Sequence, residues 1–218
     1  MDQNRSALRV GQYASILVAV ETILFAVSLV IGLAVRTSLF GPMMGYAVCT
    51  LLAASIVTMM AGFYLCSEGS RKIAGLLALL ASVLYAPFCM GNYYVQLAVV
   101  ASNPLHHPPE VLKLITFVPG SMTFALDMFG YTFLCLSTLA AAFALKDPRD
   151  KVLKALCLIH GAVAIPTVAA PIMSAVFQSN SGAANDTGSY VLLFWCALFT
   201  PIAILFFRAF SRGLRGRV

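Results

Sequence analysis

Six long apolar stretches joined by short loops constrain this sequence more than any other feature. We expect them to form helices over 12–35, 44–66, 73–101, 121–145, 152–178 and 189–210. Each is near or above the ~20 residues that a helix needs to cross the hydrocarbon of a bilayer. Because the chain has 218 residues and short loops, it leaves no room for a soluble domain. The prediction is an all-α, polytopic membrane protein in which 1–218 form a single six-helix transmembrane domain.

The loops carry positive charge alternately, which predicts how the bundle is oriented. Lys and Arg are retained in cytoplasmic loops far more often than in outer ones. If the N-terminus is inside, twelve basic residues fall on the cytoplasmic side: Arg5, Arg9, Arg71, Lys72, Lys146, Arg149, Lys151, Lys154, Arg208, Arg212, Arg215 and Arg217. Only Arg36 and Lys113 then lie outside. We therefore expect both termini to be cytoplasmic.

The net charge of +6 points to lipid rather than to nucleic acid. The basic residues stand beside the span ends, where each attracts anionic headgroups by about 1 kcal/mol. We expect anionic lipid headgroups at the cytoplasmic face as partners, and no nucleic acid. The last span is followed by an arginine tail that serves either as a topological anchor or as a contact for an acidic lipid or another protein: Arg208, Arg212, Arg215 and Arg217. Oligomerisation stays open.

The sequence predicts neither a cofactor nor a metal. Bis-histidine haem ligation needs paired histidines inside the spans, and only His160 lies in one. A retinal Schiff base needs a lysine there, and none is present. The six cysteines contain no Cys-x-x-Cys pair and are typical of small packing residues. His106, His107 and Glu110 carry zinc-ligand atoms but fit a surface loop better, because adjacent residues rarely bind one ion.

Three ionisable residues inside the spans carry most of the functional interest, because an uncompensated charge at the bilayer centre costs ~2.5 to 3.5 kcal/mol. Glu21 and His160 fall at similar depth from the cytoplasmic side, so we expect them to meet in the bundle interior. Such a pair could carry a proton. The alternative is a buried hydrogen bond that only fixes helix packing.

Asp127 belongs to a second polar layer, nearer the outer surface. Asn92 and Gln96 lie at about the same depth, and Tyr131 lies one helical turn after Asp127 on the same face. These four residues are predicted to line an outward-facing pocket for a cation, a proton or a small polar molecule. The tyrosines at 93 and 94 are typical of interfacial anchors and receive less weight, and Trp195 and Tyr190 likewise fit an aromatic belt.

Other features bear on how the helices pack. Ser102 to Gly120 is rich in proline, and Glu110 to Val118 can form a short amphipathic turn that covers a cavity. Prolines 87, 166, 171 and 201 each remove one backbone hydrogen bond within a span. Small residues at 54, 58 and 62 recur every fourth position, which predicts a face for close helix contact.

Two segments resemble a known group of proteins. They are Asn92-Tyr93-Tyr94-Val95-Gln96-Leu97 and Phe124-Ala125-Leu126-Asp127-Met128-Phe129-Gly130-Tyr131. Both are similar to stretches of six-span bacterial integral membrane proteins for which no activity is established, and they cover about a fifth of the chain. The resemblance implies a six-span fold and a bacterial cytoplasmic membrane, and it implies no mechanism.

These observations leave three classes of function. The first is a small transporter, channel-like protein or ion-binding component that uses the polar residues inside the bundle. The second is a nonenzymatic sensor, scaffold or accessory subunit. The third is an intramembrane lipid-modifying enzyme that uses a carboxylate with His160 for acid or base chemistry. Because no nucleophile elbow or nucleotide motif is present, we assign no catalytic residue and expect the first class.

Overall fold

The chain folds as a bundle of long helices in a computed structural model that describes residues 2–35, 38–103, 105–176 and 184–215. Three short turns connect or end the helices: 3-10 turns at Gly69–Arg71 and Pro148–Asp150, and a π turn at Gln96–Val100. The helices are α1 (Asp2–Ala34), α2 (Phe40–Leu65), α3 (Lys72–Val95), α4 (Pro109–Ile115), α5 (Met122–Ala144), α6 (Lys151–Ala162), α7 (Ala164–Val176) and α8 (Ala184–Arg215). Within the described ranges the regular structure is entirely helical.

Six helical segments are long and apolar enough to cross a membrane, and they match the six predicted stretches one to one. They run over Arg5–Ala34, Phe40–Leu65, Gly69–Val100, Met122–Ala144, Pro148–Met173 and Gly188–Leu214. The first and last helices are longer than predicted because their polar ends also pack. A Cβ added at Gly213 would touch Leu8, and one added at Gly11 would meet the ring of Phe210.

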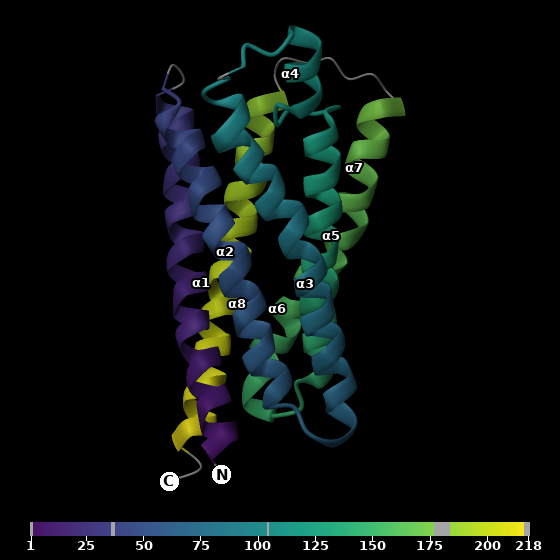
Figure 1. The fold of residues 1–218 in the computed structure, drawn as a ribbon. Coiled ribbons are helices and arrows are strands. Elements are labelled where there is room, and N and C mark those ends of the chain that lie inside the picture. Colours follow the sequence, from purple (N-terminus) through teal and green to yellow (C-terminus); the bar gives the residue numbers. More distant parts are fainter. Residues whose placement is uncertain (1, 36–37, 104, 177–183, 216–218) are drawn as a thin grey trace.

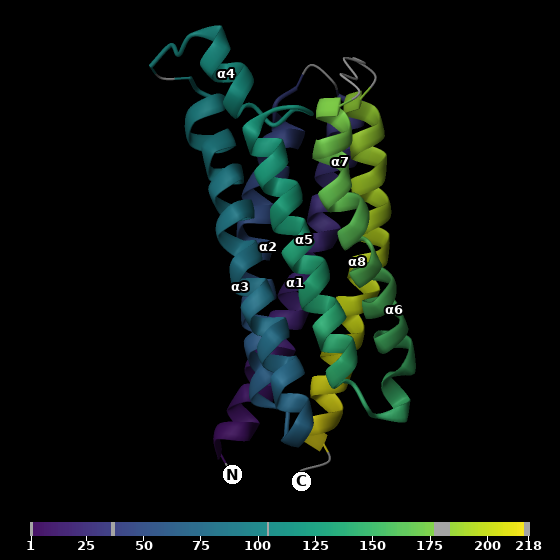
Figure 2. The same ribbon diagram turned by 90° about the vertical axis from the view of Figure 1, so that its right-hand side faces the viewer.

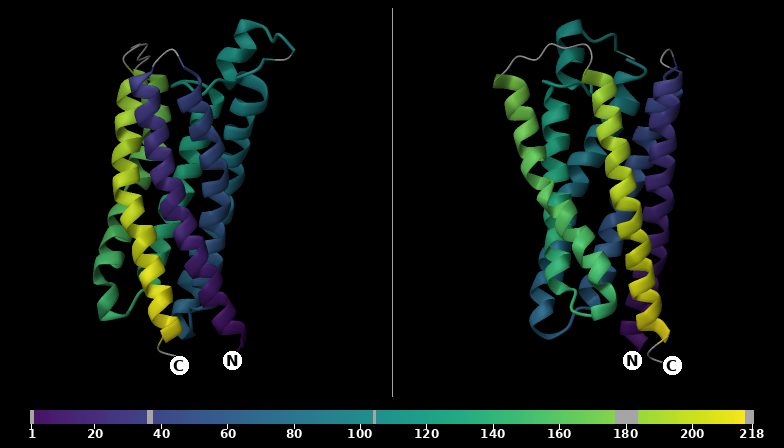
Figure 3. Two further views of the ribbon diagram at one scale, coloured as in Figure 1. Left: turned by 90° about the vertical axis from the view of Figure 1, so that its left-hand side faces the viewer. Right: turned by 180° about the vertical axis from the view of Figure 1, so that it is seen from behind.

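The helices follow one another around the bundle. α1 lies between α2 and α8, α2 lies against α3, and α3 lies against α5. α5 contacts both α6 and α7, and α6 returns to α8, which closes the bundle. Both termini lie at the end that also holds the turns near 70 and 149, which we call the terminal end, and α4 lies at the other, the α4 end (Figures 1 and 2). Figure 3 shows α7 and α8 diverging toward the α4 end.

The fifth span is broken in its middle by a proline. Pro166 has no backbone N–H, and its ring would clash with the carbonyl of the residue four positions earlier, Ala162. α6 accordingly ends at Ala162, and the N–H of Val163 turns back to the carbonyl of His160 at 3.1 Å. The prolines at 87, 171 and 201 instead lie within continuous helices α3, α7 and α8.

Glycines bring α1 and α2 into backbone contact. A Cβ added at Gly62 would lie 2.7 Å from the Cα of Gly11, and one at Gly41 would lie 2.7 Å from the backbone N of Gly32. The small-residue face predicted on α2 is wrong in part, because Ala54 and Thr58 are exposed and only Gly62 is buried. A strict four-residue repeat rotates around an α-helix, because the helix has about 3.6 residues per turn. The glycines that contact α1 therefore do not follow that repeat along α2.

This contact predicts opposite outcomes for two glycine substitutions. Gly62→Ala should destabilise the protein by about 1 to 3 kcal/mol, because the added methyl group overlaps the α1 backbone. Gly91→Ala on α3 should leave stability unchanged or slightly raise it, since nothing lies within 4 Å of that Cβ position. Thermal unfolding in detergent, followed by circular dichroism, measures both. Equal melting temperatures for the two variants would contradict the close contact.

Candidate functional site

Asp127 lies near the start of α5, where α5 and α3 approach closely. The hydroxyl of Ser121 caps the helix by accepting a hydrogen bond from the Phe124 N–H at 3.1 Å. Asp127 is only 1% exposed. Gly130, nearly one turn further along, permits the approach, because a Cβ there would lie 2.9 Å from the Sγ of Cys89 on α3. A carboxyl group is thereby enclosed between two helices.

The tyrosine that contacts this carboxyl group is one that the sequence predicts to be an interfacial anchor. Tyr93 is 4% exposed, and its hydroxyl donates to Oδ2 of Asp127 at 3.3 Å. The same hydroxyl lies 3.2 Å from that of Tyr131. Tyr94 is 65% exposed, as expected of an interfacial residue. The interfacial assignment is therefore wrong for Tyr93.

A periodic signal in α3 could have identified this tyrosine. Four buried residues stand at positions i, i+3, i+4 and i+7 and so share one face of the helix: Cys89, Asn92, Tyr93 and Gln96. The amide and acid side chains alone do not indicate the position between them. Helical spacing places Tyr93 on the same face as both amides.

Two polar atoms in this layer have no hydrogen-bond partner among the described residues. They are Oδ1 of Asp127 and the hydroxyl oxygen of Tyr85, and both are buried. The Tyr85 ring packs edge-on against Tyr131, with centroids 5.9 Å apart. A buried polar group without a partner costs about 1 to 3 kcal/mol. Such atoms mark places where a proton, an ion or a polar ligand would be stabilised.

The side-chain amides of this layer hydrogen-bond to backbone atoms that lie nearer the α4 end. Asn92 donates to the carbonyl of Thr123 at 3.0 Å. Gln96 donates to the carbonyl of Ile115 at 2.7 Å and accepts from the N–H of Phe117 at 3.0 Å. Both predicted residues therefore lie in the Asp127 layer, yet their polar atoms hold the chain in place rather than facing an open pocket.

Residues 115–117, which we call the cap, close this layer at the α4 end. The hydroxyl of Thr123 also lies 3.1 Å from the carbonyls of Ile115 and Thr116. The ring of Phe117 packs against Tyr46 and Tyr93, with centroids 6.4 Å from each. The expected short helix is present as α4, which ends at Ile115, the first residue of the cap. The segment between α3 and α5 thus covers the carboxyl group.

His160 occupies a separate and fully paired position. The indole N–H of Trp195 donates to Nε2 at 2.9 Å, so Nε2 must be the unprotonated nitrogen. Nδ1 then carries the proton and donates to the hydroxyl of Thr138 at 2.7 Å, which in turn donates to the carbonyl of Cys135 at 2.9 Å. Adding a proton at Nε2 would set two donors against each other.

Glu21 and His160 do not form the predicted pair. Oε1 of Glu21 accepts from the hydroxyl of Ser55 on α2 at 3.1 Å, and Oε2 is buried without a described partner. Both nitrogens of His160 are engaged elsewhere. Trp195 was also expected at a membrane interface and is instead 6% exposed, stacked on Phe199 with centroids 4.8 Å apart. Equal depth along two helices does not fix the direction in which their side chains point.

The arginine tail is described only in part. Arg208 is exposed, and Arg212 forms an ion pair with Asp150. The helix includes Arg215, but the placement of its side chain and the whole of Arg217 lie outside the description. Within the described residues, no group of three His, Cys, Asp or Glu side chains is arranged to hold a metal ion.

Comparison with known proteins identifies no relative of this chain. The chain matches no protein-family model, no curated protein and no solved structure. Its function is therefore inferred from its own geometry.

The hydrogen bond between His160 and Thr138 predicts the effect of replacing one hydroxyl group by a methyl group. Thr138→Val should destabilise the protein by about 1 to 3 kcal/mol, because the Nδ1–H of His160 loses its buried acceptor. Thr58→Val is the matched control, since that hydroxyl is exposed and bonds only to its own helix. Thermal unfolding of both variants tests this. A Thr138→Val variant as stable as the control would contradict the pairing.

The cap predicts how accessible the thiol of Cys89 is. In a variant that retains only Cys89, Gln96→Ala should raise the rate of labelling by a membrane-permeant maleimide about tenfold, because the cap loses its two hydrogen bonds to Gln96 and keeps only those to Thr123. A variant that retains only Cys135, which is buried on α5, reports general loosening of the helix bundle. Faster labelling of Cys89 alone supports the cap, whereas equal acceleration at both thiols would contradict it.

Proposed function

We propose that this chain is a multi-pass membrane protein that binds a proton or small cation at Asp127, acting as a small transporter, channel-like protein or ion-binding component. In this proposal all six apolar helical segments cross the bilayer. Both termini lie in the cytoplasm, and the α4 end faces outward. The proposed membrane is the bacterial cytoplasmic membrane.

Two observations support the membrane location. Large apolar side chains point away from the bundle, such as Ile73 at 71%, Leu77 at 54% and Ile165 at 75% exposed. Water would disfavour so much outward apolar surface on long helices, whereas lipid accommodates it. Basic residues also lie at the turns of the terminal end, such as Arg71 in Gly69–Arg71 and Arg149 in Pro148–Asp150, which is the asymmetry that orients membrane proteins.

The observation that carries the ion-binding proposal is the free oxygen of the buried Asp127 carboxyl group. A negative charge in an apolar bundle requires a compensating proton or cation. The described groups that act on this carboxyl are uncharged: Cys89, Asn92 and Tyr93. Since none of these described groups is cationic, the proposal takes the compensating proton or cation from solution. The adjacent tyrosine hydroxyls supply further oxygen atoms, which hard cations prefer as ligands.

Flux measurements in proteoliposomes test this function. Asp127→Asn keeps the shape of the side chain but removes its charge, so proton or cation flux should fall at least tenfold. Glu21→Gln tests the deeper carboxyl group. Glu110→Gln on the exposed α4 is the control and should retain full flux. If neither Asp127→Asn nor Glu21→Gln changes the flux, the transport proposal is wrong.

A nonenzymatic scaffold or accessory subunit is the second candidate. It is favoured because polar side chains inside the bundle hydrogen-bond to neighbouring segments and so stabilise packing, as Asn92, Gln96 and His160 do. If Asp127→Asn abolishes folding rather than flux, this candidate gains support. The enzyme alternative is weaker, because acid or base chemistry by His160 needs a free nitrogen near a carboxylate, and both of its nitrogens are bonded.

A further inference from the structure

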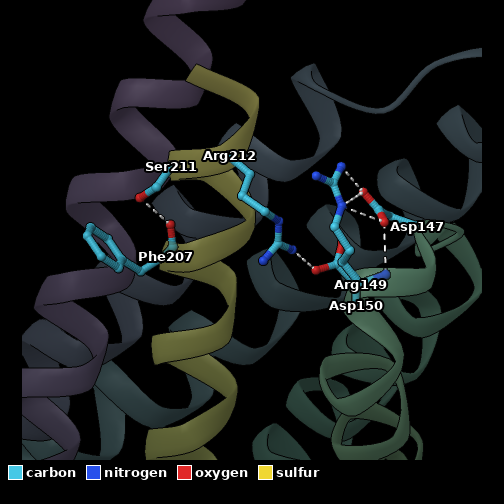
Figure 4. Close-up of polar contacts among 6 residues, drawn as sticks. All are labelled: Asp147, Arg149, Asp150, Phe207, Ser211 and Arg212. Carbon is cyan, nitrogen blue, oxygen red and sulfur yellow. Dashed lines mark hydrogen bonds and ion pairs between the residues drawn. The ribbon is translucent and has the colours of Figure 1, made fainter. Parts of the chain in front are cut away.

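A pocket opens between α1 and α8 at the terminal end. Its volume is about 380 Å³, and it is lined by Gln12, Phe207, Arg208, Ser211, Arg212 and Leu214. Gln12 belongs to α1 and donates to the hydroxyl of Ser211 at 2.9 Å, which joins the two helices. That hydroxyl donates in turn to the carbonyl of Phe207 at 2.7 Å, a contact visible in Figure 4. The pocket therefore combines donors, arginines and apolar side chains.

The charge around this pocket is unevenly compensated. Arg149 hydrogen-bonds to Asp147 and lowers the pKa of that carboxyl group to about 2, and Arg212 pairs with Asp150 (Figure 4). Each of these two acids is thus matched by one arginine. Arg208 is exposed and has no ion-pair partner among the residues described. It leaves one uncompensated guanidinium at the pocket.

Further positive charge lies along the same side of α1. Arg5 and Arg9 precede Gln12 by seven and three residues, so helical spacing places all three on one face. Both arginines are exposed. The α1 face that borders the pocket is consequently basic over two turns, and a bound anion would be attracted from both helices.

We propose that this pocket binds the phosphate headgroup of an anionic phospholipid. Arg208 and Arg212 bind the phosphate oxygens, as guanidinium groups do through paired N–H donors. Phe207 and Leu214 contact the glycerol and the first acyl carbons, which a free phosphate lacks. The proposal rests on the membrane location proposed above but not on ion binding at Asp127.

Asp150 sets the strength of this site. Its carboxylate occupies the guanidinium of Arg212, so a bound phosphate competes with it for the same donors. Removing that charge should strengthen lipid binding, even though it removes an ion pair from the protein. A purely structural role for Arg212 predicts no such gain. The two interpretations therefore differ in sign.

The test is a lipid titration of the full chain in phosphatidylcholine nanodiscs with increasing phosphatidylglycerol. Thermal unfolding is followed by the fluorescence of Trp195, which is the single tryptophan. Each variant is compared with its own melting temperature without phosphatidylglycerol. Arg208→Gln should weaken the apparent affinity by more than the roughly fivefold that one basic residue at a membrane surface contributes. Asp150→Asn should strengthen it, and the control Lys154→Gln, exposed on α6, should weaken it by no more than that general effect.

Several results would overturn the proposal. If Lys154→Gln weakens binding as much as Arg208→Gln, general surface charge explains the effect. If inorganic phosphate stabilises the protein as well as phosphatidylglycerol does, the site takes a free anion and not a lipid. If Asp150→Asn weakens binding, Arg212 is not a lipid ligand. The Asp127→Asn variant should respond to lipid like the wild type, so failure here is distinguishable from failure of the ion-binding proposal.

Discussion

The need to pair polar groups inside an apolar bundle governs this structure. Several interior hydrogen bonds join helices that apolar packing alone would hold together less specifically. Ser137 donates to the carbonyl of Ala78 at 2.7 Å and joins α5 to α3, and the Trp195 indole joins α8 to His160 on α6. Among the described residues, the buried atoms without such a partner are Oδ1 of Asp127, Oε2 of Glu21 and the hydroxyl of Tyr85.

The sequence predicted the helices well because hydrophobic length depends on local composition alone. A run of apolar residues long enough to cross a bilayer is recognisable without knowledge of its neighbours. The break before Pro166 was not predictable in this way, because the prolines at 87, 171 and 201 also lack an N–H and yet lie within continuous helices. The helix ends were less predictable, because α1 extends to Asp2 through contacts made with α2 and α8.

Side-chain partners were predicted poorly, because they depend on how each helix is rotated about its axis. His160 and Glu21 were placed at one depth, yet they face Thr138 and Ser55 respectively. Trp195 shows the same limit: its position near a span end suggested an interface, whereas its indole N–H found a buried acceptor. By contrast, Asn92 and Asp127 do share a layer, since α3 and α5 are adjacent and antiparallel.

The interruption after Ala162 divides one crossing into two pieces with different attachments. α6 is held by α5 and α8, whereas α7 is fastened to α5, including a hydroxyl contact of 3.0 Å between Thr132 and Thr167. A continuous helix would transmit a tilt from one end to the other as a rigid rod. Here the two pieces are attached separately, so α7 can tilt together with the half of α5 nearer the α4 end while α6 stays packed against α8.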